Sequence, residues 1–174
     1  MLKKFHKLLD EPLDWKIDGI FKRSYTLYHQ NEPLAHFQQE SGIFKMDGSI
    51  YLHEAKEPLF IFRPKGLFES RVDVESSDID FEPAKLKPHR WGGGLKIDFL
   101  NGNRYSWEKS DFWNSSWALK GENEGIIAVI QANTFGTNRT LTILSDAPHP
   151  AELNLLIFAG WAQYIFELQA VGAA

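Results

Sequence analysis

The sequence from Leu155 to Leu168 reads LLIFAGWAQYIFEL, and its only strongly polar side chains are Gln163 and Glu167. A helix of this length covers about 21 Å at about 1.5 Å per residue, whereas a membrane span needs about 20 apolar residues. At about 100° per residue, Glu152, Gln163 and Glu167 fall on one narrow stripe, and large apolar side chains fill the remaining arc. Such a helix must be buried on nearly all sides. We therefore expect a core helix over residues 150–169, and neither a membrane anchor nor an interfacial helix.

Between residues 23 and 145 the pattern changes to short alternating or aromatic runs separated by turn residues, which is typical of β-strands. Asp47-Gly48 and Asn101-Gly102 are strong signals for two-residue hairpin turns. Residues 83–94, with two prolines and three consecutive glycines, are expected to form a flexible loop. The expected strands are 25–28, 34–39, 42–46, 49–53, 59–63, 70–75, 79–82, 95–100, 103–108, 112–119, 125–132 and 139–144.

The strand count and the helix together predict one architecture. Eight strands close into a barrel whose interior fits only side chains, so enclosing a helix needs a larger barrel, such as an eleven-stranded can. We predict a mainly β chain, a closed antiparallel barrel of about 11–12 strands around the C-terminal helix, as a single domain over residues 1–174. Trp117 is expected to pack against that helix. The alternative is a two-sheet sandwich whose open side the helix plugs.

The first residues predict a short N-terminal helix within residues 1–15, ended by Pro12. Its apolar side chains share one face by helical spacing: Leu2, Phe5, Leu8 and Leu9. We expect this helix to cap one end of the barrel; the alternative is that it lies on an anionic membrane.

Composition limits the function classes. The 174 residues carry a net charge of −4 and no cysteine, which disfavours generic nucleic-acid binding and excludes disulfides, thiolate metal sites and a cysteine nucleophile. No nucleotide-binding, phosphate-loop or catalytic serine motif is present, so we expect no cofactor and no enzymatic activity. No apolar run of signal-peptide type precedes Asp10, so we expect a cytoplasmic protein.

A basic stretch is the first candidate site. Lys85, Lys87, His89 and Arg90 lie in the expected loop, and Arg63 and Lys65 are candidates to join them from a neighbouring turn. Cationic donors of this kind bind anionic lipid head groups; the alternative is ordinary solvated surface charge.

An acidic stretch is the second candidate site. Asp78, Asp80 and Glu82 would share one face of a strand, and converging oxygen ligands of this kind bind calcium. The favoured alternative is a solvated strand face with Ile79 and Phe81 pointing inward.

The order of parts resembles the tubby C-terminal-like superfamily, which includes tubby domains, phospholipid scramblases and LURP-one-related proteins of plants and bacteria. The parts that carry the resemblance, over about residues 23–169, are Tyr25-Thr-Leu-Tyr28 followed by Asn31-Glu32-Pro33-Leu34, the two hairpin signals, Ile126-Ile-Ala-Val-Ile130 and the apolar helix from Glu152-Leu153.

The resemblance implies a lipid-related module, because tubby domains bind phosphoinositides and scramblase-like members are membrane-associated. We therefore expect a non-enzymatic binding module for an anionic lipid head group, a membrane surface or a protein partner, peripheral to the membrane rather than integral to it. The alternative is a lipocalin-like small-molecule carrier with eight strands, an external helix and an open lumen.

Overall fold

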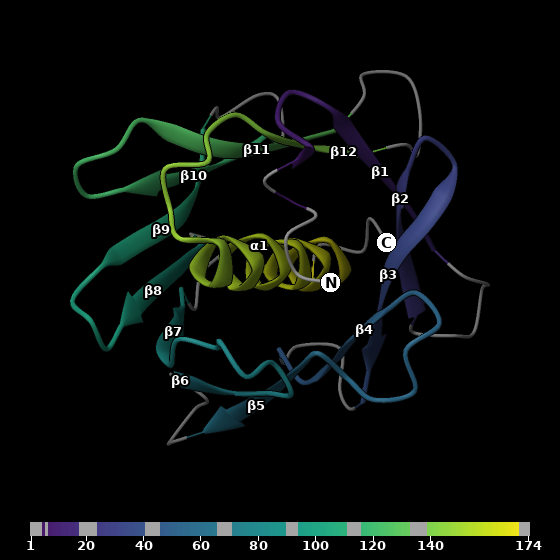
Figure 1. Ribbon diagram of the computed structural model, residues 1–174, viewed down its shortest axis with the longest axis horizontal. Coiled ribbons are helices and arrows are strands. Elements are labelled where there is room, and N and C mark those ends of the chain that lie inside the picture. The colour runs from purple at the N-terminus through teal and green to yellow at the C-terminus, as the bar shows by residue number, and fades with distance from the viewer. Residues whose placement is uncertain are drawn as a thin grey trace.

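The computed structural model shows a ring of twelve strands around a single helix (Figure 1). It describes residues 5, 7–17, 24–40, 46–65, 71–89, 94–110, 116–132 and 139–170. The helix is α1 (Pro150–Ala170). The strands are β1 (Pro12–Ile17), β2 (Ser24–His29), β3 (Glu32–Gln39), β4 (Gly48–Leu52), β5 (Phe60–Lys65), β6 (Arg71–Ser76), β7 (Ala84–Pro88), β8 (Leu95–Phe99), β9 (Arg104–Lys109), β10 (Trp117–Gly121), β11 (Ile126–Ala132) and β12 (Arg139–Ile143).

The sheet is a closed antiparallel barrel. Each strand pairs with its neighbours in the chain, and β1 closes the ring by pairing with β12, with Pro12 opposite Thr142. Because strand side chains alternate between faces, every second residue points to the interior; Leu95, Ile97 and Phe99 of β8 are buried in this way. The predicted closed barrel is confirmed.

The helix fills the interior of this barrel (Figure 1). Residues 151–166 are all buried, and aromatic rings of the wall pack on it edge to face: Phe37 on Trp161, with ring centroids 6.4 Å apart, and Trp117 on Tyr164 at 5.6 Å. The predicted core helix is confirmed, and the sandwich and the eight-stranded barrel with an external helix are wrong. Across the described residues, no helix combines the length and the hydropathy that a membrane span requires.

Gly160 sets the closest approach between α1 and the wall. The ring of Trp107 on β9 lies against it, so that a Cβ at position 160 would sit 2.1 Å from two ring atoms. The indole N–H of Trp107 donates a hydrogen bond to the Leu156 carbonyl at 2.8 Å. This glycine is required by packing, because no side chain fits between the helix and a fully buried tryptophan.

A buried carboxylate ties the start of α1 to the β8–β9 hairpin. Glu152 accepts hydrogen bonds from the Asn101 amide at 2.6 Å, the Asn103 amide at 3.0 Å and the Tyr105 hydroxyl at 2.9 Å. Burial, together with the Glu152 carboxylate, raises the pKa of Tyr105, so its phenol stays a donor. A buried charge is tolerated only when it is paired or well hydrogen-bonded, and here three donors meet that requirement.

The other end of α1 carries a second polar set. Glu167 accepts a hydrogen bond from Gln163 at 3.2 Å and lies 3.8 Å from the Lys109 ammonium. Burial is the main cause that raises the pKa of Glu167, and the contacts with Gln163 and Lys109 oppose it. Gln169 donates to Gln39 at 3.0 Å. These contacts place Lys109 of β9 and Gln39 of β3 at the end of the barrel where α1 finishes.

The N-terminal segment differs from its prediction. Pro12 does not end a helix but begins β1, so residues 12–15 of the predicted helix form a strand. Proline is compatible with the first position of a strand, and Leu13 and Trp15 alternate with exposed residues. Phe5 is buried edge to face against Phe158 at 5.1 Å, as expected of a cap on the barrel. Residues 1–4, with Leu2, lie outside the described residues.

Two of the turn and loop predictions are also corrected. Gly48 is not a hairpin turn residue but belongs to β4, paired with Gln39 of β3, and a Cβ there would meet the Gln38 carbonyl at 2.5 Å. The expected loop 83–94 contains β7, whose central Leu86 is buried between exposed lysines. Residues 42–45 of an expected strand lie outside the described residues.

Another turn is shifted and one is confirmed. The predicted turn at Asn31-Glu32-Pro33 occurs one residue earlier, at Gln30 and Asn31, which both have positive φ. The hairpin predicted at Asn101-Gly102 is confirmed, with Gly102 at φ 98°, but its turn has three residues and not two, because Phe99 lies opposite Asn103.

Candidate functional site

Four cations lie side by side on the outer wall of β5, β6, β7 and β8. Lys65 is opposite Arg71 and Lys87 is opposite Lys96, and the pairing of Val72 with Leu86 sets Arg71 beside Lys87. We call Lys65, Arg71, Lys87 and Lys96 the cation row. Because neighbouring strands are about 4.8 Å apart, the row extends over about 14 Å.

Strand alternation fixes the direction of these side chains. Phe62, Val72, Leu86 and Ile97 point inward and are at most 1% exposed. Residues of the opposite parity point to solvent, and all four members of the cation row are exposed. The row is therefore held by the packing of the barrel and does not depend on a loop.

Carboxylates neutralise only part of this wall. Arg71 pairs with Asp73 at 2.9 Å and Lys87 with Asp98 at 2.7 Å. The side chains of Lys65 and Lys96 make no ion pair or hydrogen bond within the described parts of the chain. Solvent-exposed ion pairs contribute at most about 1 kcal/mol, so even the paired cations remain available to a ligand.

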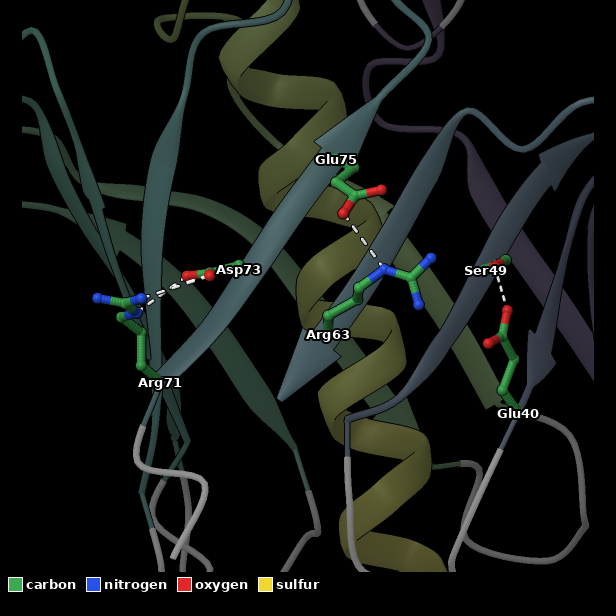
Figure 2. A network of polar contacts seen from close by, with 6 residues as sticks. All are labelled: Glu40, Ser49, Arg63, Arg71, Asp73 and Glu75. Atoms are coloured by element: carbon green, nitrogen blue, oxygen red, sulfur yellow. Dashed lines mark hydrogen bonds and ion pairs between the residues drawn. The ribbon is translucent and has the colours of Figure 1, made fainter. Parts of the chain in front are cut away.

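The adjacent outward positions carry charges of both signs. Arg63 donates to Glu75 at 3.2 Å across β5 and β6, which Figure 2 shows beside the Arg71–Asp73 pair. Lys85 stands opposite Asp98. With these residues the wall has six cations and three carboxylates, a local charge of +3 on a chain of net charge −4. The cations are Arg63, Lys65, Arg71, Lys85, Lys87 and Lys96, and the carboxylates are Asp73, Glu75 and Asp98.

The cation row belongs to a wider separation of charge along the barrel. At the end where α1 finishes, the two outermost residues of each strand and the described connections carry the cations Lys16, Lys65, Arg71, Lys87, Lys96, Lys109 and Arg139, against the carboxylates Glu40, Asp47 and Glu108. The described connections at the opposite end carry Asp10, Glu11, Glu54, Glu57, Asp78, Asp80, Glu82, Glu122, Glu124 and Asp146, against Lys7 and Lys56. Such a distribution orients the protein in the field of a charged surface.

The structure brings together most of the predicted lipid-binding residues. Arg63 and Lys65 lie on β5, and Lys85 and Lys87 on β7, with only β6 between them. The prediction that Lys85 and Lys87 occupy a loop is wrong. His89 is exposed after β7, where its backbone N–H donates to the Gly94 carbonyl at 2.9 Å.

One predicted residue of this set lies outside the described part of the chain, and two members of the cation row were not predicted. Arg90 lies outside the described residues. Sequence reasoning missed Arg71 and Lys96, although each alternates with a buried residue, Val72 or Leu95, as an outward strand residue does. Their place beside Lys65 and Lys87 depends on strand pairing, which the local pattern does not show.

The predicted calcium ligands are not brought together. Residues 78–82 form a turn between β6 and β7 and not a strand, because the Asp78 side chain accepts the Asp80 backbone N–H at 3.2 Å. Ile79 is 96% exposed and does not point inward. Among the described residues, which include Asp78, Asp80 and Glu82, no three carboxylate or histidine groups are placed to hold a metal ion.

Comparison with protein-family models, with curated proteins and with solved structures gives no match for this chain.

Proposed function

We propose that the protein is a non-enzymatic binding module that attaches to an anionic membrane surface through the wall of β5–β8. The observation that carries the proposal is the cation row, in which Lys65, Arg71, Lys87 and Lys96 lie on four adjacent strands. Lipid phosphates and carboxylates are the chemical complement of such a row. The proposed location is the cytoplasmic face of a membrane, where anionic lipids give a negative surface potential.

The charge distribution supports an oriented contact. Each Lys or Arg near an anionic leaflet contributes about 1 kcal/mol, so the row supplies about 4 kcal/mol before the costs of association. The carboxylates at the opposite end of the barrel are repelled by the same surface. Since the whole chain has a net charge of −4, attraction depends on the wall facing the membrane.

The architecture supports a family assignment as part of the proposal. A barrel around a C-terminal helix is what the resemblance to the tubby C-terminal-like superfamily implied, and we propose membership on that ground. The alternative of a lipocalin-like carrier has lost its main support, because α1 occupies the interior that a ligand would need.

Vesicle co-sedimentation tests the proposal. Neutral phosphatidylcholine vesicles are compared with vesicles that also contain phosphatidylserine. The test variant is Lys65→Glu/Lys96→Glu, which reverses the two unpaired members of the row. The matched control is Lys7→Glu/Lys56→Glu, which reverses two exposed lysines at the acidic end. Both variants change the net charge by the same amount, so only the position of the charge differs.

We expect the wild type and the control variant to bind anionic vesicles, with binding that weakens as salt is added. The row variant should bind at least about tenfold more weakly, since two attractions of about 1 kcal/mol each become repulsions. Equal binding to neutral and anionic vesicles, or equal binding by the row variant and the control, would refute the proposal.

A further inference from the structure

Arg139 is an inward-facing arginine at the end of the barrel where α1 finishes. It is the first residue of β12, where it pairs with Trp15 of β1 and Ala132 of β11. It has the parity of Leu141 and Ile143, which are fully buried. Its guanidinium carbon lies 5.3 Å from the centroid of the Trp15 ring and 5.8 Å from that of Tyr164 on α1. The residue is half-buried, and its guanidinium carbon lies over both aromatic rings.

Among the described residues, the side-chain donors of Arg139 have no acceptor. Within the described parts of the chain, no carboxylate pairs with the guanidinium and no hydrogen bond uses it. A cation–π contact uses the charge of the group and does not consume its five N–H donors, which can therefore bind an anion. Because Arg139 is half-buried, it is only partly withdrawn from water, and an oxygen anion at this position would add charge-assisted hydrogen bonds to it.

Trp15, the cross-strand partner of Arg139, also has a donor that finds no acceptor among the described residues. Its side chain is 3% exposed, and its indole N–H is buried without a hydrogen-bond partner. Buried indole N–H groups normally find an acceptor. Trp15 and Arg139 are direct cross-strand partners, so two residues that touch both present unused donors.

We propose that Arg139 and Trp15 form a binding site for a small oxyanion, a phosphate or carboxylate group, at this end of the barrel. Two oxygens of the ligand accept from the fork of Arg139 in the bidentate manner typical of guanidinium groups, and the indole N–H of Trp15 donates to the same ligand group. The site is separate from the cation row, because Arg139 faces the interior of β12 and the row lies on the outer face of β5–β8.

Phosphate titration followed by NMR of the indole N–H groups tests this site. The chain has six tryptophans, and a Trp15→Phe variant assigns the signal of Trp15. Inorganic phosphate is added at constant ionic strength against chloride, and acetate is titrated in parallel as the carboxylate probe. We expect the Trp15 signal to shift and saturate with at least one of the two anions.

Substitutions at Arg139 distinguish a loss of anion binding from a loss of folding. Arg139→Gln should weaken binding at least about tenfold, because charge-assisted hydrogen bonds are lost. Arg139→Lys, which keeps the charge and loses the fork, should bind more weakly than wild type. The other indole signals report whether each variant is folded. If Trp15 shows no saturable shift in the wild type with phosphate, with acetate or with vesicles that contain phosphatidic acid, or if a folded Arg139→Gln binds with unchanged affinity, the site does not exist.

Two further arms identify the source of the oxyanion and keep the two proposals apart. Saturation by inorganic phosphate or acetate in solution indicates a free anion, whereas saturation only by vesicles that contain phosphatidic acid indicates a lipid head group. The Lys65→Glu/Lys96→Glu variant should keep the response of Trp15 to the free anions. The Lys65→Glu/Lys96→Glu variant can therefore lose vesicle binding while the Arg139–Trp15 site is intact. Likewise, Arg139→Gln can lose the response of Trp15 while the cation row is intact.

Discussion

Gly160→Ala should destabilise the protein, although alanine is the better helix former. In an exposed helix, replacing glycine by alanine is favourable by about 1 kcal/mol. At position 160 the new methyl carbon would lie 2.1 Å from atoms Cε2 and Nε1 of Trp107, whereas carbon atoms normally approach no closer than about 3.5 Å. The ring must therefore move by more than about 1 Å, and it is fully buried.

The expected change in the free energy of unfolding is the sum of two unfavourable contributions and one favourable contribution. Overpacking of a filled core costs about 1–3 kcal/mol. Displacing the ring weakens the hydrogen bond from Trp107 to the Leu156 carbonyl, a loss of about 0.5–1.5 kcal/mol. After the gain in helix propensity, the net loss is about 1–3 kcal/mol. For a chain of this size, that lowers the melting temperature by about 2–12 °C.

Urea denaturation and calorimetry measure this loss against a matched control. Gly125→Ala makes the same change in the β10–β11 connection, where a Cβ would meet nothing within 4 Å, so its effect should be neutral or stabilising by up to about 1 kcal/mol. Adding Trp107→Phe should relieve the clash, so the double variant should lose less stability than the sum of the two single variants. A Gly160→Ala protein as stable as wild type would refute the packing argument.

Three further predictions concern α1. Glu152→Gln should cost about 2–4 kcal/mol in urea denaturation, because charge-assisted hydrogen bonds from Asn101, Asn103 and Tyr105 are lost; a loss below about 0.5 kcal/mol would contradict this. Burial raises the pKa of Glu167, so its contribution is fully present below the unfolded pKa near 4.3 and is lost as pH rises. Glu167→Gln should therefore gain stability relative to wild type between pH 4 and pH 7, and an unchanged difference would refute the sign. A chain that ends before Leu155 should be unfolded by circular dichroism; a cooperative unfolding transition would refute the role of α1 as the core.

The central helix could be predicted because its signal is local. Fourteen residues from Leu155 to Leu168 are too few to span a membrane and too apolar to lie on a surface, and these facts depend on no distant part of the chain. The requirement for a large barrel followed from the width of a helix. The hairpin at Asn101-Gly102 was equally local, because its glycine takes a positive φ.

Two of the errors in strand assignment, at β1 and β7, arose from proline. Pro12 was interpreted as the end of a helix, and Pro83 and Pro88 as marks of a loop, although Pro12 and Pro88 are the first residue of β1 and the last of β7. In both strands the alternation of apolar and charged residues was present in the sequence. Proline breaks a strand only where its missing N–H is needed, and strand ends do not need it.

The candidate site was predicted in part because its geometry is not local. The sequence predicted Arg63, Lys65, Lys85 and Lys87 as site residues and predicted β6 as a strand over residues 70–75, but it did not show that β6 pairs with both β5 and β7. Arg71 and Lys96 became members of the row only through pairing across four strands. The sequence did not predict Arg139 as a site residue, because an isolated arginine at the start of a strand is typical of surface charge. Only the pairing of β12 with β1 places it opposite Trp15.

The pairing of β1 with β12 also has a consequence for folding. It joins Pro12 to Thr142, and contacts between residues so distant in sequence form slowly, because a long loop must close first. The helix that fills the barrel follows the last strand, so during synthesis all twelve strands leave the ribosome before the side chains that cover their inner faces. Closing the ring early would trap an empty interior. We therefore expect the barrel to close only after α1 has emerged, with folding as a single late event of the whole chain.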